Sequence, residues 1–258
     1  MSLTTVDFGR LDLQPGERIL DVGCGEGRHT LTAWLEHPVH AVGLDLGADD
    51  LATAASRRDE FRELADATGE ARADFLRASA LQMPFADASF DVVVCSEVLE
   101  HIHDYRGVLA EIHRVLKPGG RFVASVPRAW PERLCWWLSD AYHEAPGGHI
   151  RIFDAADLRR AIEHQGFGFR SRHWAHALHV PYWWLRCLGD PDRPDDNPLA
   201  RLWHRLLVWD LMEAPRLTRR LERLLNPVLG KSVVLYFERG GQRGGQQAAG
   251  RGAEQAAA

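Results

Sequence analysis

The chain has 258 residues, of which 45% are hydrophobic and 26% charged, and its formal net charge is -5. This length suits one large α/β domain with insertions, and the acidic balance disfavours a nucleic-acid substrate, which usually requires a basic surface. The four cysteines lack the spacing of a zinc site, which indicates reduced thiols in a cytoplasmic protein. Neither a leader segment nor an apolar run of about twenty residues is found, so we expect no membrane span.

The first informative segment joins an apolar strand to a glycine-rich turn and a helix. A turn at residues 14–16 precedes a predicted strand at 18–22, and a helix is predicted from Thr30 to Leu35. Glycine lets the backbone adopt positive φ and brings its N–H groups close to a ligand. A dinucleotide-binding loop would need a third glycine at position 28, which is Arg28. The pattern therefore predicts a different nucleotide-like ligand for the loop that contains Asp21, Gly23, Cys24, Gly25 and Gly27.

A second strand is predicted at residues 40–45 and ends in Asp45, followed by Leu46. An acid about twenty residues beyond the glycine loop is placed to accept hydrogen bonds from ribose hydroxyls. The alternative is that Asp45 caps the helix predicted from Ala48.

Two further segments complete the pattern of a parallel sheet. Residues 90–96 are nearly all apolar, as expected for a strand covered on both faces, and residues 116–126 give a helix end, a Pro-Gly-Gly turn and another strand. Together, the D-x-G-x-G-x-G loop and these strands resemble the class I S-adenosylmethionine-dependent methyltransferases over roughly residues 13 to 126.

The resemblance implies a Rossmann-like, seven-stranded, mostly parallel sheet with an antiparallel last strand and helices on both faces. It also implies S-adenosylmethionine as cofactor, with the adenine near Ser79, Ala80 and Leu81 and the methionine end near Ser96 and Glu97. The family usually has an acid where this chain has Ser79, so the adenine contact there would pass through a hydroxyl or a water molecule.

Eight of the nine tryptophans follow residue 129, and seven of these eight lie in insertions at about 127–150 and 178–229. Such segments lie beyond the carboxyl ends of the parallel strands, where open α/β sheets bind ligands, so we expect a helical aromatic lid over an apolar small-molecule site. Adjacent tryptophans, as in Trp136-Trp137 and Trp183-Trp184, cannot both face one core. The segment 199–220 is predicted to be an amphipathic basic helix, which suits peripheral contact with an anionic membrane, a lid or a dimer contact equally well.

Candidate chemistry centres on the Glu97-x-x-Glu100-His101 segment after the strand at 90–96. Positions i, i+3 and i+4 share a helix face, so these groups are expected to converge, and His149 follows the next strand. The cluster resembles the metal-assisted O-methyltransferases, but the favoured interpretation has no metal: Glu97 lies near the methionine end and His101 or His149 acts as general base. A divalent cation is the less favoured alternative.

The end of the chain is predicted to add a helix at 154–165, a strand at 167–175 and a final strand near 231–238. Residues 1–239 are then one methyltransferase domain, and residues 240–258 are too poor in apolar side chains to fold. We expect methyl transfer to a small apolar acceptor, most often at oxygen, by a monomer or homodimer. A non-catalytic cofactor-binding partner subunit and a nicotinamide-dependent oxidoreductase are the alternatives.

Overall fold

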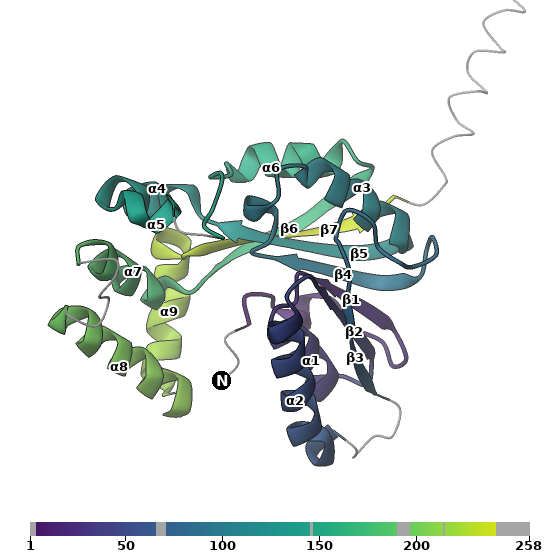
Figure 1. Ribbon diagram of the computed structural model, residues 1–258, viewed down its shortest axis with the longest axis horizontal. Helices are drawn as coiled ribbons and strands as arrows, with labels where there is room; N and C mark the ends of the chain where they lie inside the picture. Colours follow the sequence, from purple (N-terminus) through teal and green to yellow (C-terminus); the bar gives the residue numbers. More distant parts are fainter. Residues whose placement is uncertain (1–3, 66–70, 145–146, 190–196, 214, 241–258) are drawn as a thin grey trace, which may run out of the picture.

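A seven-stranded sheet in the order β3-β2-β1-β4-β5-β7-β6 organises the computed structural model (Figure 1). The structure describes residues 4–65, 71–144, 147–189, 197–213 and 215–240. All paired strands run parallel except β7, which is antiparallel to both β5 and β6. This confirms the Rossmann-like sheet with an antiparallel last strand. The strands are β1 (Arg18–Val22), β2 (His40–Asp45), β3 (Arg72–Arg77), β4 (Phe90–Ser96), β5 (Leu116–Pro127), β6 (Phe167–Ala175) and β7 (Ser232–Arg239).

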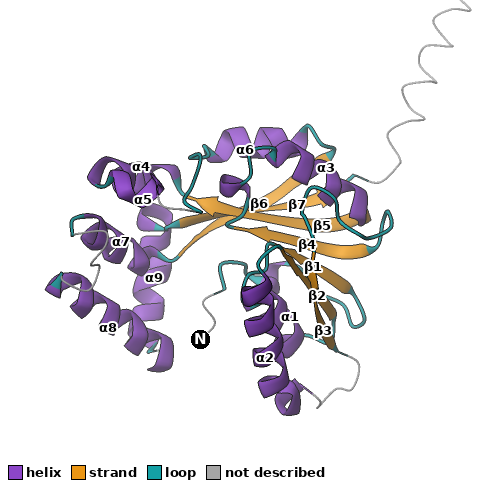
Figure 2. Cartoon of the chain, viewed as in Figure 1, coloured by secondary structure: helices purple, strands orange, loops and turns teal. Residues whose placement is uncertain are grey.

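Helices cover both faces of the sheet and extend beyond one of its edges (Figure 2). On one face lie α1 (Arg28–Glu36), α2 (Ala48–Ala65) and the short η1 (Phe8–Arg10), and on the other α3 (Tyr105–Val115) and α6 (Ala155–Glu163). The remaining helices gather beyond the carboxyl ends of β5 and β6. They are η2 (Leu99–His101), α4 (Ala129–Leu138), α5 (Asp140–Glu144), η3 (Ala177–His179), α7 (Val180–Cys187), α8 (Pro198–Glu213) and α9 (Arg216–Leu229).

The burial pattern explains the two layers. In β4, alternate side chains enter opposite cores, so Val93 packs with α3 and α6 while Val92 and Val94 pack with α1 and the N-terminal segment. Because both faces are covered, the strand is apolar almost throughout rather than alternating.

Three expectations about elements need correction. The strand predicted after the Pro-Gly-Gly turn begins earlier, at Leu116, because the backbone of this turn continues β5. The segment 199–220 forms parts of two helices rather than one, since α8 ends at Glu213 and α9 starts after Pro215. Proline has no backbone N–H with which to continue the first helix. Glu97, Glu100 and His101 do not share an α-helix, because Glu97 has a left-handed backbone (φ 57°) before the short η2.

Three remaining expectations concern the C-terminal tail, membrane-spanning helices and the four cysteines. The tail expected to be disordered lies outside the described residues from residue 241 onward. Among the described helices, none has the length and apolar character needed to cross a bilayer. The four cysteines, at positions 24, 95, 135 and 187, are buried and free of disulfides.

Candidate functional site

The glycine loop between β1 and α1 is closed on two sides and open on one. A Cβ on Gly23 would lie 2.3 Å from a Val98 methyl, and one on Gly27 would lie 2.9 Å from the Phe75 ring. Gly25 has φ +51° and nothing within 4 Å of the same position. The loop therefore packs tightly against the protein at both ends and offers its open approach at Gly25, which is the shape that a nucleotide-like ligand requires.

Asp45 connects this loop to the start of α2. Its two carboxylate oxygens accept hydrogen bonds of 2.8 Å from the backbone N–H groups of Gly25 and Gly47. The Gly47 bond, one residue before α2, corresponds to the capping alternative. Because each carboxylate oxygen has two lone pairs, the half-buried Asp45 retains acceptor sites for ribose hydroxyls beside Gly25.

Asp21 and Cys24 point into the protein rather than toward the open side of the loop. Asp21 accepts hydrogen bonds from the backbone N–H and the hydroxyl of Thr30, at 3.1 and 2.8 Å. Burial raises its pKa to about 6, although the Thr30 bonds oppose the shift. The Cys24 thiol is buried against Gly43, and burial raises its pKa far above the ordinary range. Both side chains position the loop from behind.

Apolar side chains flank the next two strand ends. Leu46 follows β2 with 63% of its surface exposed, and Leu81 is also exposed. The Ser79 hydroxyl accepts a hydrogen bond from the Leu81 backbone N–H, so it holds its own turn, and Ala80 is buried behind it. Exposed leucines after two strand ends are the kind of apolar side chain on which an aromatic base can lie.

The end of β4 carries a chain of short hydrogen bonds. The Ser96 and Ser125 hydroxyls lie 2.7 Å apart, and Ser125 donates to a Glu97 carboxylate oxygen at 2.9 Å. The Glu97 backbone N–H also bonds to the Ser125 carbonyl. These contacts hold Glu97 in its left-handed backbone conformation, a strain that is typical of functional sites.

A second group brings together three of the sequence candidates. Glu100, His101 and His149 each offer a ligand atom within 4.8 Å of the others, and the two imidazole rings lie 4.9 Å apart edge to face. Burial raises the pKa of Glu100 well above its ordinary value, and the nearby Glu97 carboxylate adds to the effect. Neither oxygen of Glu100 has a hydrogen-bond partner in the part of the chain that the structure describes. Glu97, which the sequence placed in this group, instead bonds to Ser125.

Glu132 is the group that sequence reasoning missed. This α4 carboxylate, 3% exposed, lies 2.5 Å from His149 Nδ1 and also accepts hydrogen bonds from the Trp136 indole and the Tyr142 hydroxyl. Although burial opposes it, the hydrogen bond with His149 holds the pKa of Glu132 below its ordinary value. Its location within the aromatic insertion was the available signal, but 17 residues separate it from His149 and no spacing rule joins them.

The aromatic insertions surround this dyad. The Tyr142 ring contacts both His149 and Trp183 edge to face, at 6.2 and 5.9 Å between centroids. In the Trp136–Trp137 pair the side chains diverge as expected, since Trp136 donates to Glu132 whereas Trp137 is 79% exposed. Trp183 and Trp184, in contrast, both line one small pocket beside α4. The Lys231 ammonium lies 4.7 Å from the centre of the Trp183 ring.

Comparison with known proteins identifies the scaffold. A family model described as a methyltransferase domain matches residues 20–124. The chain is 37% identical over 177 residues to a demethylmenaquinone methyltransferase of Corynebacterium glutamicum, which is 61% of this chain and 70% of that protein. The chain belongs to the class I S-adenosylmethionine-dependent methyltransferases.

Other matches agree with this assignment. An O-methyltransferase of Aspergillus nomiae is 39% identical over 112 residues, 43% of this chain and 47% of that protein. The chain spans less than half the length of the first three curated relatives it matches. A crystal structure of a methyltransferase from Methanosarcina mazei shares the fold with a TM-score of 0.60 and 16% identity, over 93% of this chain and all of that one.

S-adenosylmethionine is accordingly the cofactor of this methyltransferase. The residues present fit it: Gly25 leaves the loop open where a bulky ligand must approach, and Asp45 lies hydrogen-bonded beside that opening. The glycine spacing and the comparisons both disfavour the nicotinamide-dependent oxidoreductase.

Proposed function

We propose that this methyltransferase methylates an oxygen atom of a small, apolar molecule, with His149 as the general base. The observation that carries the proposal is the 2.5 Å contact between Glu132 and His149 Nδ1. A buried carboxylate that holds one ring nitrogen fixes the tautomer and orientation of the imidazole, so that its other nitrogen can accept a proton.

The cofactor supplies an electrophilic methyl group when bound. The residues of the chain bind the cofactor, position the loop and accept the proton of the attacking hydroxyl. Gly25 and Asp45 would hold the ribose side of the cofactor. Leu46 and Leu81 would flank its adenine, and Ser96 and Glu97 would lie near its methionine end. The buried Asp21 and Cys24 position the loop, and the turn of Ser79 and Ala80 supports Leu81. His149 takes the hydroxyl proton as the oxygen attacks, with His101 beside it.

The aromatic lid supports an apolar acceptor. Tyr142 and Trp183 lie against one another next to His149, and their rings exclude water from the reacting atoms. A hydroxyl on an apolar ring or chain would place its carbon skeleton against these rings and its oxygen toward His149.

A metal-assisted variant of the same reaction is favoured by one observation. The Glu100 carboxylate is buried with both oxygens unpartnered among the described residues, and His101 and His149 complete a set of three ligands. A divalent ion held by these residues would lower the pKa of the acceptor hydroxyl. Glu132 would then orient His149 as a ligand instead of as a base.

The first experiment is a calorimetric titration with S-adenosylmethionine, S-adenosylhomocysteine and NADH, followed by an acceptor screen with phenols, hydroxyquinones, alcohols and matched amines. We expect S-adenosylmethionine and S-adenosylhomocysteine to bind and NADH not to bind, and we expect hydroxyl acceptors to give release of S-adenosylhomocysteine. Cofactor binding without transfer to any acceptor would favour the non-catalytic partner subunit, and transfer to the amines alone would overturn the oxygen assignment.

Two variants then locate the acceptor site. Trp183→Ala should raise KM for the acceptor about tenfold and leave cofactor affinity unchanged, while Trp137→Ala, at an exposed position, serves as control.

A chelator distinguishes the two mechanisms. Turnover that survives a chelator supports His149 as base, and turnover restored only by added divalent ions supports the metal-assisted variant.

We also propose that α8 and α9 contact an anionic membrane surface from a cytoplasmic location. Leu217, Leu221, Leu224 and Val228 are exposed along one side of α9. The same helix carries Arg216, Arg219, Arg220 and Arg223, a composition that suits the lipid headgroup boundary. A homodimer contact is the competing use of this surface.

A further inference from the structure

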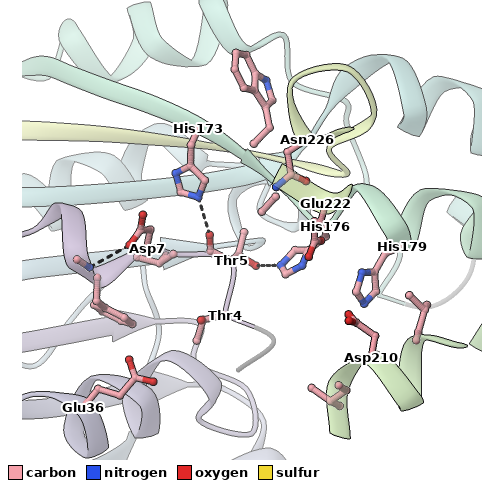
Figure 3. Close-up of a pocket in the computed structure, with 17 residues that line it drawn as sticks. Thr4, Thr5, Asp7, Glu36, His173, His176, His179, Asp210, Glu222 and Asn226 are labelled. Atoms are coloured by element: carbon pink, nitrogen blue, oxygen red, sulfur yellow. Dashed lines mark hydrogen bonds between the residues drawn. The ribbon is translucent and has the colours of Figure 1, made fainter. Parts of the chain in front are cut away.

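A cavity of about 340 Å³ lies between the N-terminal segment, the end of β6 and helices α8 and α9 (Figure 3). It shares no lining residue with the cluster of Glu100, His101, Glu132 and His149. The proposed methyl transfer therefore leaves the polar groups of this cavity without a role.

Three of these polar groups are arranged as metal ligands. His176, His179 and Glu222 each offer a ligand atom within 4.8 Å of the others. His176 precedes the 3₁₀ helix η3 and His179 is its last residue. The three-residue period of this helix brings positions i and i+3 to the same side, and the two rings lie 5.2 Å apart. His176 adopts a left-handed backbone with φ 65°, a strained conformation for a residue other than glycine.

A buried and unpartnered carboxylate provides an independent observation. Asp210 of α8 is only 6% exposed, and Figure 3 shows its carboxylate beside the His179 ring. Asp210 Oδ1, Glu222 Oε1 and His179 Nδ1 all lack a hydrogen-bond partner within the described ranges of the chain. His173 Nδ1, which also lines the cavity, is a fourth such atom. Buried polar atoms are normally paired, so these four atoms point to a ligand in the cavity that can bond to several of them.

Charge considerations point to the same kind of partner. Neither Asp210 nor Glu222 forms an ion pair with a described residue. Two carboxylates and two neutral imidazoles around a divalent cation give a net charge of zero, which removes the cost of burying two like charges. Burial and the neighbouring Asp210 raise the pKa of Glu222, so the ion would have to displace any proton that this carboxyl holds.

We propose that His176, His179 and Glu222 bind a divalent transition-metal ion, of which Zn²⁺ is the best match, with Asp210 as the additional carboxylate. Two imidazoles with carboxylate oxygens are ligands that Zn²⁺ and Co²⁺ accept, whereas Mg²⁺ and Ca²⁺ prefer oxygen ligands alone.

The ion would link helices α8 and α9 to the segment that follows β6. Glu222 belongs to α9, Asp210 to α8, and the histidines follow β6 directly. His176 Nε2 also lies 3.2 Å from the Thr5 hydroxyl, so the N-terminal segment joins the same site. The role is structural, since the ligands come from three separate elements and none belongs to the proposed methyl-transfer site.

The test measures metal binding by the full chain stripped with a chelator. Co²⁺ is titrated by visible absorption and Zn²⁺ by calorimetry and thermal melting, in the His101→Ala/His149→Ala background so that the other cluster cannot contribute. We expect one ion per chain and a melting temperature raised by several degrees with Zn²⁺ but not with Mg²⁺.

Substitutions then assign the ligands. His179→Ala and Glu222→Gln should each weaken binding by about 10- to 100-fold, whereas His204→Ala, an exposed α8 histidine, should have no effect. Glu222→Gln keeps the side-chain size, and S-adenosylhomocysteine binding reports that each variant remains folded. Zn²⁺ affinity that is absent in the background chain, or unchanged by Glu222→Gln, would overturn the proposal.

Discussion

Glu132 and Asp21 are both buried carboxyl groups, yet their surroundings shift their pKa values in opposite directions. Hydrogen bonding to His149 holds the pKa of Glu132 low despite burial, while burial of Asp21 outweighs two bonds from Thr30. The hydrogen bond with the His149 imidazole favours the ionised form of Glu132, whereas the two Thr30 donors compensate for the burial of Asp21 only in part. The same residue chemistry therefore gives an ionised orienting group in one place and a pH-sensitive group in the other.

Glu132→Gln tests the orienting role. We expect turnover to fall about 100-fold with little change in KM, because the amide keeps the Trp136 contact but no longer stabilises a protonated His149. Glu144→Gln, an exposed α5 residue, is the matched control. Release of S-adenosylhomocysteine provides the measurement, and an unchanged turnover would remove Glu132 from the mechanism.

Asp21→Asn tests the buried carboxyl. The pKa of Asp21 is about 6 in the folded protein against 3.8 for an ordinary aspartate, so the folded state binds more protons between these two pH values. The stability of the wild-type protein should therefore fall as pH rises through this window.

The asparagine variant lacks this loss of stability. Between pH 4.5 and 7.5 we expect it to gain about 1–3 kcal/mol relative to wild type in urea unfolding, with exposed Asp74→Asn showing no such trend. A stability difference that does not change with pH would contradict the raised pKa.

At the scale of elements, two glycines of the β1–α1 loop have different structural roles. Gly23 has no space for a side chain, since Val98 lies against it, while Gly25 faces open space. The first glycine serves packing and the second serves ligand access, a distinction that their common spacing in the sequence does not reveal.

Alanine substitutions should distinguish the two positions. Gly23→Ala should cost about 2–4 kcal/mol of folding stability through backbone strain and the clash with Val98, and Val98→Ala should restore part of it. Gly25→Ala should cost about 1 kcal/mol yet weaken S-adenosylhomocysteine binding at least tenfold, by filling the open side. Denaturant unfolding and calorimetry measure both quantities, and normal binding by Gly25→Ala would place the cofactor elsewhere.

For the whole molecule, the arrangement of α8 and α9 leaves an apolar surface uncovered. Met212, Leu217 and Leu224 are each about three-quarters exposed, although helices of folded proteins usually bury such side chains. The membrane proposal assigns this surface to anionic lipid.

Vesicle sedimentation tests the assignment. The chain should sediment with anionic vesicles and not with zwitterionic ones, and Leu217→Glu/Leu224→Glu should abolish sedimentation, while Leu188→Glu on α7's end should not. Ultracentrifugation of the same proteins gives the competing outcome: a dimer that the double substitution dissociates would replace the membrane proposal.

Local sequence patterns predicted most of the sheet, although β3 was not among the predicted strands. β1, β2 and β4 match the predicted ranges because apolar runs bounded by turn residues specify buried parallel strands. The range of β6, an antiparallel strand with alternating burial, also matches, and the family resemblance of the glycine loop indicated the cofactor class. The sequence predicted helices in the tryptophan-rich segments, but it did not predict the division between α8 and α9, since the amphipathic pattern continues across Pro215.

Contacts between segments far apart in the sequence could be identified only in the folded structure. The Glu132–His149 dyad joins residues from different parts of an insertion, and the His176, His179, Glu222 and Asp210 cluster joins three elements. Residue spacing predicts which side chains share one helix or strand, but it does not predict how separate helices pack. The chemistry of both clusters depends on that packing, which is why they became visible only in three dimensions.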